Sequence, residues 1–121
     1  MCIRETILIF GLLCMPLAAA AEPVAGRNGD AILKMCQGAE KVKSLSVMCH
    51  NYLNGFLDAT AWDARRGGKG GAAFCLGEGD KERIPTTLVT WMNAHPDALK
   101  QDAGEALHRM LGDSFPCGKK R

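Results

Sequence analysis

The sequence has few aromatic residues, no strand-like alternation and no closely spaced cysteine pair, and each of these absences excludes a class of protein. One Tyr, two Trp and four Phe among 121 residues are too few for the base-stacking platforms of single-stranded nucleic-acid binders. No run alternates apolar and polar side chains for long enough to form a sheet. No two cysteines are spaced as C-x-x-C, so the usual spacing of a zinc site is missing.

The charges are nearly balanced, and the first residues are typical of an export signal. Fifteen basic and thirteen acidic side chains give a net charge of +2, which provides no electrostatic reason to bind nucleic acid or a membrane. Arg4 is followed by an apolar run at 7–17 and by four alanines at 18–21, the order of a secretory signal peptide. The run is shorter than the roughly 18–20 residues that span a bilayer. We therefore predict a cleaved signal peptide at 1–21 and an exported domain at 22–121, with no membrane attachment after cleavage.

The longest periodic stretch runs from Leu45 to Trp62 and predicts an amphipathic helix. Its apolar or small residues share one helical stripe and lie at positions 45, 48, 49, 52, 53, 56, 57, 60 and 61. Ser44 or Ser46 is expected to cap it, and the helix should end at Arg65-Arg66. Because glycine inside a helix costs about 1 kcal/mol relative to alanine, we expect a neighbouring element to approach closely at Gly55. Trp62 and Trp91 are interpreted as core or half-buried residues.

Three further helices are predicted, giving an all-α domain of four helices. The first opens at Asn28 or Asp30, the third runs from about Asp80 to a stop at Pro96, and the fourth is capped by Asp97 and ended by Gly112. Short connections favour antiparallel neighbours, so an up-and-down bundle is expected. The glycine-rich segment 67–71 predicts a flexible or partner-contacting loop. It does not have the form of a phosphate-binding loop, because Lys69 is followed by glycine.

The mature domain keeps an even number of cysteines, which in an exported protein predicts disulfides rather than a metal site. They are Cys36, Cys49, Cys75 and Cys117. In an up-and-down bundle, crossed pairs would be about 20 Å apart along the long helix, whereas a disulfide tolerates about 7 Å between Cα atoms. We therefore prefer Cys36–Cys49 and Cys75–Cys117 over the two other connectivities.

No combination of side chains predicts catalysis, a cofactor or a metal. Cys49 and His50 point about 100° apart on a helix, so they cannot form a nucleophile–base pair. Glu105 and His108 have the spacing of half a di-metal site, but no second copy exists, and we interpret them as a solvated helix face. His95 is expected to interact with the last carbonyls of its helix.

Several motifs together resemble one known family. The residues C-H-N-Y-L-N-G-F-L-D at 49–58 are similar to its C-x-x-Y-x-x-G-x-x-D/A helix, and Phe74-Cys75 matches the F-C pair that follows. W-M-N-A-H-P at 91–96 and F-P-C at 115–117 complete the series. From about Asp30 to Cys117 the chain resembles the Rap/Tai immunity proteins, which bacteria use against type VI secretion effectors. Many relatives have proline after the F-C pair, where this chain has Leu76-Gly77.

The resemblance implies a small helical periplasmic protein that binds and blocks a protein toxin, often one that attacks peptidoglycan, without being an enzyme. Exposure and loop position lead us to predict effector contacts at Arg65, Arg66, Lys69 and Asp80. The sequence leaves open whether the domain also forms a homodimer. The alternative hypothesis is a periplasmic acid-stress chaperone or another small exported helical binding protein, although three histidines and no acidic cluster offer little to drive an acid response.

Overall fold

The computed structural model describes residues 26–69 and 73–118, and helices account for the elements in both ranges. In chain order these are α2 (Gly29–Gln37), the 3-10 helix η1 (Gly38–Glu40), α3 (Lys43–Arg65), α4 (Asp80–Ala94), the 3-10 helix η3 (Pro96–Leu99) and α5 (Ala103–Ser114). The predicted all-α class with four α-helices is confirmed. The predicted signal peptide at 1–21 lies outside the described residues.

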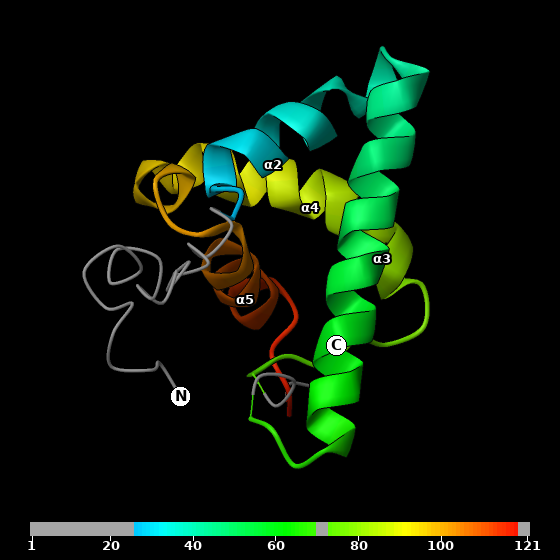
Figure 1. Ribbon diagram of the computed structural model, residues 1–121, viewed down its shortest axis with the longest axis vertical. Helices are drawn as coiled ribbons and strands as arrows, with labels where there is room; N and C mark the ends of the chain where they lie inside the picture. The colour runs from blue at the N-terminus through cyan, green and yellow to red at the C-terminus, as the bar shows by residue number, and fades with distance from the viewer. Residues whose placement is uncertain (1–25, 70–72, 119–121) are drawn as a thin grey trace, which may run out of the picture.

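The helices do not form the expected up-and-down bundle. α3 stands along one side of the molecule, α2 and α4 run crosswise to it, and α5 lies on the inner side of α3 (Figure 1). The prediction of antiparallel neighbours was wrong because both short connections contain a 3-10 helix, η1 after α2 and η3 after α4. Each of these turns redirects the chain to a new angle instead of reversing it.

The core lies between α2, α4 and α5, and α3 is at its edge. Its largest fully buried apolar side chains are Ile32, Ile84, Leu88, Met92, Leu107, Met110, Leu111 and Phe115. α3 is the longest helix, yet it buries only Cys49, Leu53 and Thr60. The predicted stripe on α3 is thus only partly buried, and Met48 is 46% exposed.

Among the described α-helices, two have a side-chain cap, and one of these caps was predicted. Asn28 Oδ1 accepts a hydrogen bond from Ala31 N at 3.0 Å and caps α2. α5 is capped by Asp102, not Asp97, because residues 96–99 form η3 and α5 begins only at Ala103; it continues past Gly112 to Ser114. The prediction of a serine cap on α3 was also wrong, since Val42 occupies that position in extended conformation.

A network around Trp91 joins α4, η3 and α5. The buried indole donates from Nε1 to Asp113 Oδ2 at 3.0 Å, and its ring stacks on His95 with centroids 4.0 Å apart. His95 Nδ1 lies 2.7 Å from the Trp91 carbonyl oxygen, as predicted for the end of this helix. The Arg109 guanidinium sits 5.3 Å from the indole centroid and donates to Asp97 Oδ2 at 2.9 Å.

Tyr52 of α3 packs under the segment that leads into α2. The Arg27 guanidinium lies 5.8 Å from the centre of its ring. Burial raises the pKa of Tyr52, Asp102 raises it further, and Arg27 opposes this change. The phenol therefore stays neutral at physiological pH, and its contact with Arg27 is a cation–π contact.

Two disulfides connect the elements, in the predicted pairs. Cys36 at the end of α2 is joined to Cys49 of α3 with Cα atoms 5.0 Å apart. Cys75 is joined to Cys117 with Cα atoms 4.8 Å apart, and Cys75 N also donates to Phe115 O at 2.9 Å. The first pair is buried, whereas both cysteines of the second are exposed.

This difference in exposure predicts stepwise reduction. Under native conditions dithiothreitol should reduce Cys75–Cys117 first, because thiolate attack requires access to a sulfur atom. Cys36–Cys49 should react only when α3 detaches or the domain unfolds. Timed alkylation followed by peptide mass spectrometry measures both rates, and equal rates without denaturant would contradict the burial of the first pair.

The contact between Arg109 and Asp97 predicts a pH effect. Hydrogen bonding to Arg109 holds the pKa of Asp97 below its ordinary value, which is about 3.9. Asp97 therefore contributes stability above about pH 4, and this contribution is lost as the pH falls through its folded-state pKa. In Arg109→Met the pKa of Asp97 should rise toward the ordinary value, as measured by NMR titration of its carboxyl carbon. Lys34→Met, which removes a different ion pair, is the control and should leave Asp97 unchanged.

Candidate functional site

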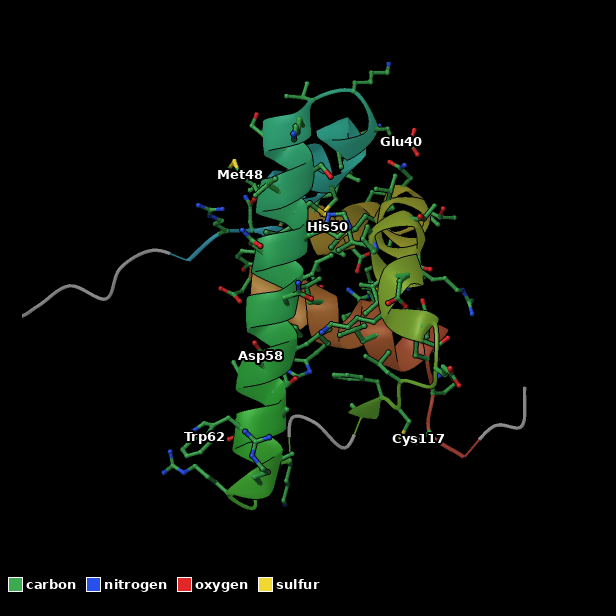
Figure 2. All side chains as sticks on the ribbon, turned by 90° about the vertical axis from the view of Figure 1, so that its right-hand side faces the viewer. Glu40, Met48, His50, Asp58, Trp62 and Cys117 are labelled. Atoms are coloured by element: carbon green, nitrogen blue, oxygen red, sulfur yellow. A yellow bond between two sulfur atoms is a disulfide. The ribbon has the colours of Figure 1, made fainter. Side chains whose placement is uncertain are left out.

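The C-terminal end of α3 exposes an aromatic ring beside two guanidinium groups. Trp62 is 56% exposed, and the guanidinium carbons of Arg65 and Arg66 lie 5.7 and 5.8 Å from the ring centroid, within cation–π range. Gly67, with a φ of 83°, takes the left-handed conformation that ends the helix, and the exposed Lys69 follows. We call Trp62, Arg65, Arg66 and Lys69 the α3 tip; Figure 2 labels Trp62 near the lower end of the helix.

Three of the four predicted contact residues lie together at the α3 tip, and the fourth, Asp80, is buried elsewhere. Arg65, Arg66 and Lys69 are all exposed at the α3 tip, and their role in binding stays a prediction. Asp80 is only 2% exposed, so its choice as an exposed contact was wrong. As the first residue of α4, its carboxylate accepts hydrogen bonds from Gly77 N at 2.7 Å and Arg83 Nη1 at 3.1 Å. Asp80 closes the turn that leads into α4.

Trp62 was predicted to lie in or near the core, but it is exposed at the end of α3. A signal was present: position 62 does not belong to the apolar stripe predicted for this helix. Trp62 shares a line with Gly55 and with Met48, an exposed member of the predicted stripe, and the three are seven residues apart. Because seven residues are nearly two full turns, these three side-chain positions lie above one another on the helix surface. Figure 2 shows Met48 and Trp62 on the same side of α3.

The line through Met48, Gly55 and Trp62 forms an open surface, which we call the α3 ridge. Val47, next to Met48, is 51% exposed. Apart from its chain neighbours and the backbone of its own helix, no atom of the described residues lies within 4 Å of the position that a Cβ atom would occupy at Gly55. The expected close approach of a neighbouring element at Gly55 was therefore wrong. The glycine lies bare on the outside of the helix.

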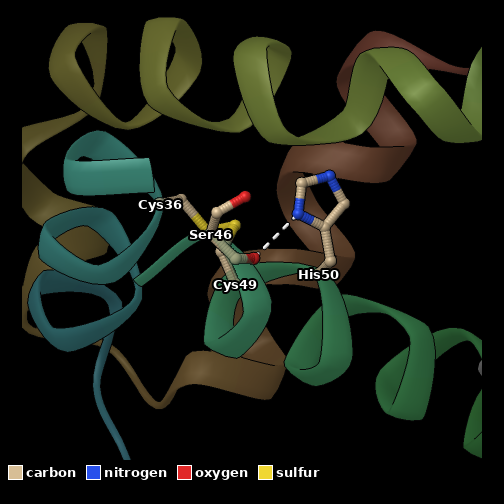
Figure 3. The surroundings of a disulfide bond; sticks show 4 residues. All are labelled: Cys36, Ser46, Cys49 and His50. Atoms are coloured by element: carbon tan, nitrogen blue, oxygen red, sulfur yellow. Dashed lines mark hydrogen bonds between the residues drawn. A yellow bond between two sulfur atoms is a disulfide. The ribbon is translucent and has the colours of Figure 1, made fainter. Parts of the chain in front are cut away.

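His50 faces a groove beside the buried disulfide, but it has no reactive thiol to activate. Cys49 is bonded to Cys36 and is fully buried. His50 Nδ1 lies 2.8 Å from the Ser46 carbonyl oxygen (Figure 3). The groove has a volume of about 380 Å³, and Glu40 is among the residues that line it. The interpretation of Cys49 as a structural cysteine is confirmed by its bond to Cys36.

His108 is part of the packing between α3 and α5. Its ring contacts Phe56 edge-on with centroids 5.0 Å apart, and the centroid of Phe74 lies 6.3 Å away. The interpretation of His108 as part of a solvated face was thus wrong, because α3 and the Phe74 segment cover it. Glu105 is exposed and accepts a hydrogen bond from Gln101. Within residues 26–69 and 73–118, no three His, Cys, Asp or Glu side chains form a group that could hold a metal ion.

A family model matches residues 28–117, from the cap of α2 to the last cysteine of the second disulfide, and its description is Rap1a immunity proteins. The chain belongs to the Rap1a immunity protein family. This membership implies immunity to a secreted effector, and therefore a protein as binding partner. The comparison with curated proteins and the comparison with solved structures each found no match. In the described part of the chain, no helix combines the length and apolarity needed to cross a membrane.

The exposure of the α3 ridge predicts unusual mutational effects on stability. Gly55→Ala should raise the free energy of unfolding by up to about 1 kcal/mol, because alanine favours the helix and its methyl group meets no neighbour. Trp62→Ala should change it by no more than about 0.5 kcal/mol. Trp91→Ala, the buried control, should cost about 3–5 kcal/mol. Urea unfolding measures all three, and a destabilised Gly55→Ala would show that the ridge is covered in solution.

Proposed function

We propose that this protein is a periplasmic immunity protein that binds a type VI secretion effector, one that attacks peptidoglycan, and blocks it without catalysis of its own. The observation that carries this proposal is the match to the Rap1a immunity proteins over residues 28–117. That range contains both disulfides and all four α-helices, so the similarity covers the whole described fold.

The two disulfides support action outside the cytoplasm. Disulfides form and persist in oxidising compartments such as the periplasm. The signal-like sequence at 1–21 supplies a route to that compartment. A cell-wall hydrolase delivered by a neighbouring cell acts in the same space, so an immunity protein against it must be exported too.

The α3 tip supports binding of a protein surface. Tryptophan and arginine are the residue types most enriched among the energetically dominant contacts of protein interfaces. Trp62, Arg65 and Arg66 occur together at one exposed helix end, where a partner can reach them without displacing any part of the described fold. We propose that the effector contacts this tip.

The proposal predicts protection that depends on export. Secreted hydrolases encoded beside this gene should lyse cells when directed to the periplasm, and coexpression of the full chain should prevent lysis by one of them. A variant lacking residues 1–21 should give no protection, because it stays in the wrong compartment. Cell density after induction is the readout, and purified oxidised protein should bind the same hydrolase in calorimetry.

Two outcomes would contradict the proposal. One is full protection by the variant without residues 1–21, which would place the protein's action in the cytoplasm. The other is a full chain that is exported and oxidised yet neither protects against nor binds any of the neighbouring hydrolases. Mass spectrometry of the periplasmic fraction verifies export and oxidation in each strain.

A further inference from the structure

We propose that the α3 ridge binds in an apolar groove of the effector, and that this groove carries carboxylates at both of its ends. This inference rests on the proposed function and names the surface and the chemistry of its partner. The ridge includes Trp62 of the α3 tip and extends the contact along α3 to Met48. Seven residues advance a helix by about 10 Å, so the ridge from Met48 to Trp62 is about 20 Å long.

The exposed apolar side chains of the domain are concentrated on this helix. Among the described residues, the large hydrophobic side chains that are exposed are Val42, Val47, Met48 and Trp62, at 44%, 51%, 46% and 56%. All four lie on α3 or directly before it. Scattered exposed hydrophobics need no explanation, but here Met48 and Trp62 lie on one side of the same helix, with Val47 beside Met48.

Gly55 supports a groove that closes around the helix. Glycine in the interior of a helix destabilises it by about 1 kcal/mol relative to alanine, and no packing contact in the described fold requires it at this position. On the ridge, however, the missing side chain leaves the backbone accessible between Met48 and Trp62. A partner surface can therefore approach closely at the centre while these two side chains act as anchors on either side, as in helix-in-groove recognition.

The charges on and around α3 indicate what kind of surface its partner presents. Residues 41–69 contain five basic side chains near the two ends of α3 and two acidic ones, Asp58 and Asp63, between them, whereas the rest of the chain contains ten basic and eleven acidic ones. Lys41 and Lys43 lie at the start of α3, and Arg65, Arg66 and Lys69 lie at its end. A groove with carboxylates at both ends complements this pattern, which steers association and excludes partners of the same sign.

The same charges disfavour a second copy of this chain on the ridge. In an antiparallel two-fold pair crossing at Gly55, Met48 would meet Trp62 of the other copy, and the basic start of α3 would approach the basic end of the other copy's α3. In a parallel two-fold pair, each basic end would face itself. Either arrangement brings like charges together, at a cost in binding free energy.

The test compares two tryptophan substitutions on adjacent residues. Gly55→Trp fills the centre of the ridge, whereas Asn54→Trp places the same side chain on an exposed position about 100° around the helix. Calorimetry with the effector identified by the protection assay should show at least a 100-fold weaker affinity for Gly55→Trp and less than a threefold change for Asn54→Trp. Circular dichroism and urea unfolding establish that both variants are folded. Met48→Glu, a second ridge variant, should also weaken binding at least 10-fold.

The partner's charge is tested separately. Arg65→Glu/Arg66→Glu should lower the association rate at least 10-fold and reduce its dependence on salt concentration, because complementary charges act chiefly on encounter. An association rate that rises in this double variant would overturn the assignment of a carboxylate-rich groove.

The outcomes separate the two proposals. If the wild type binds the effector and Gly55→Trp and Met48→Glu bind equally well, the ridge is not the contact surface and the immunity function stands. If light scattering finds a wild-type dimer that Gly55→Trp dissociates, a second copy occupies the ridge and the inference is overturned. If the wild type binds no effector, the proposed function itself fails and the inference fails with it.

Discussion

The disulfide between Cys36 and Cys49 ties the longest helix of the domain to its core. α3 has 23 residues but buries only three side chains, and one of these is Cys49 itself. Tyr52, Phe56 and Leu57 of α3 also pack against the core, but they are only partly buried. A bridge across a loop of this length adds about 3 kcal/mol in the chain-entropy model, and it acts where α3 begins.

The second disulfide fixes the segment that follows α3 in the chain. Cys75–Cys117 and the hydrogen bond from Cys75 N to Phe115 O attach the segment before α4 to the tail after α5. Phe115 is completely buried, so this attachment is anchored in the core. The two disulfides hold α3 from both ends, and within the described residues its outer face packs against no other element.

Local signals in the sequence predicted what depends on neighbouring residues. Asn28 caps α2 because an amide oxygen three residues before a free backbone N–H suffices. The disulfide pairing was right although the bundle was wrong. Cys36 ends one helix and Cys49 lies early in the next, so the short connection keeps them close at either crossing angle.

The errors arise where two local solutions compete and tertiary packing selects one. Asp97 and Asp102 both offer a cap before α5, and only the formation of η3 after Pro96 leaves the role to Asp102. Glycine in a helix fits either a close neighbour or a bare surface, and the crosswise placement of α3 leaves Gly55 bare. Asp80 was predicted to be an exposed loop residue, yet its carboxylate is buried and accepts a hydrogen bond from the Gly77 backbone N–H. No rule that considers one helix at a time distinguishes these cases.

The fold also determines which charges a partner meets. Several carboxylates are engaged internally: Asp80 with Arg83, Asp97 with Arg109, and Asp113 with the Trp91 indole. Among the described residues, by contrast, no carboxylate pairs with the basic groups of the α3 tip. A nearly neutral chain thereby presents a basic helix end. The overall charge says little about the partner, because the internal contacts hold acidic groups in place while the arginines beside Trp62 remain open to a carboxylate from outside.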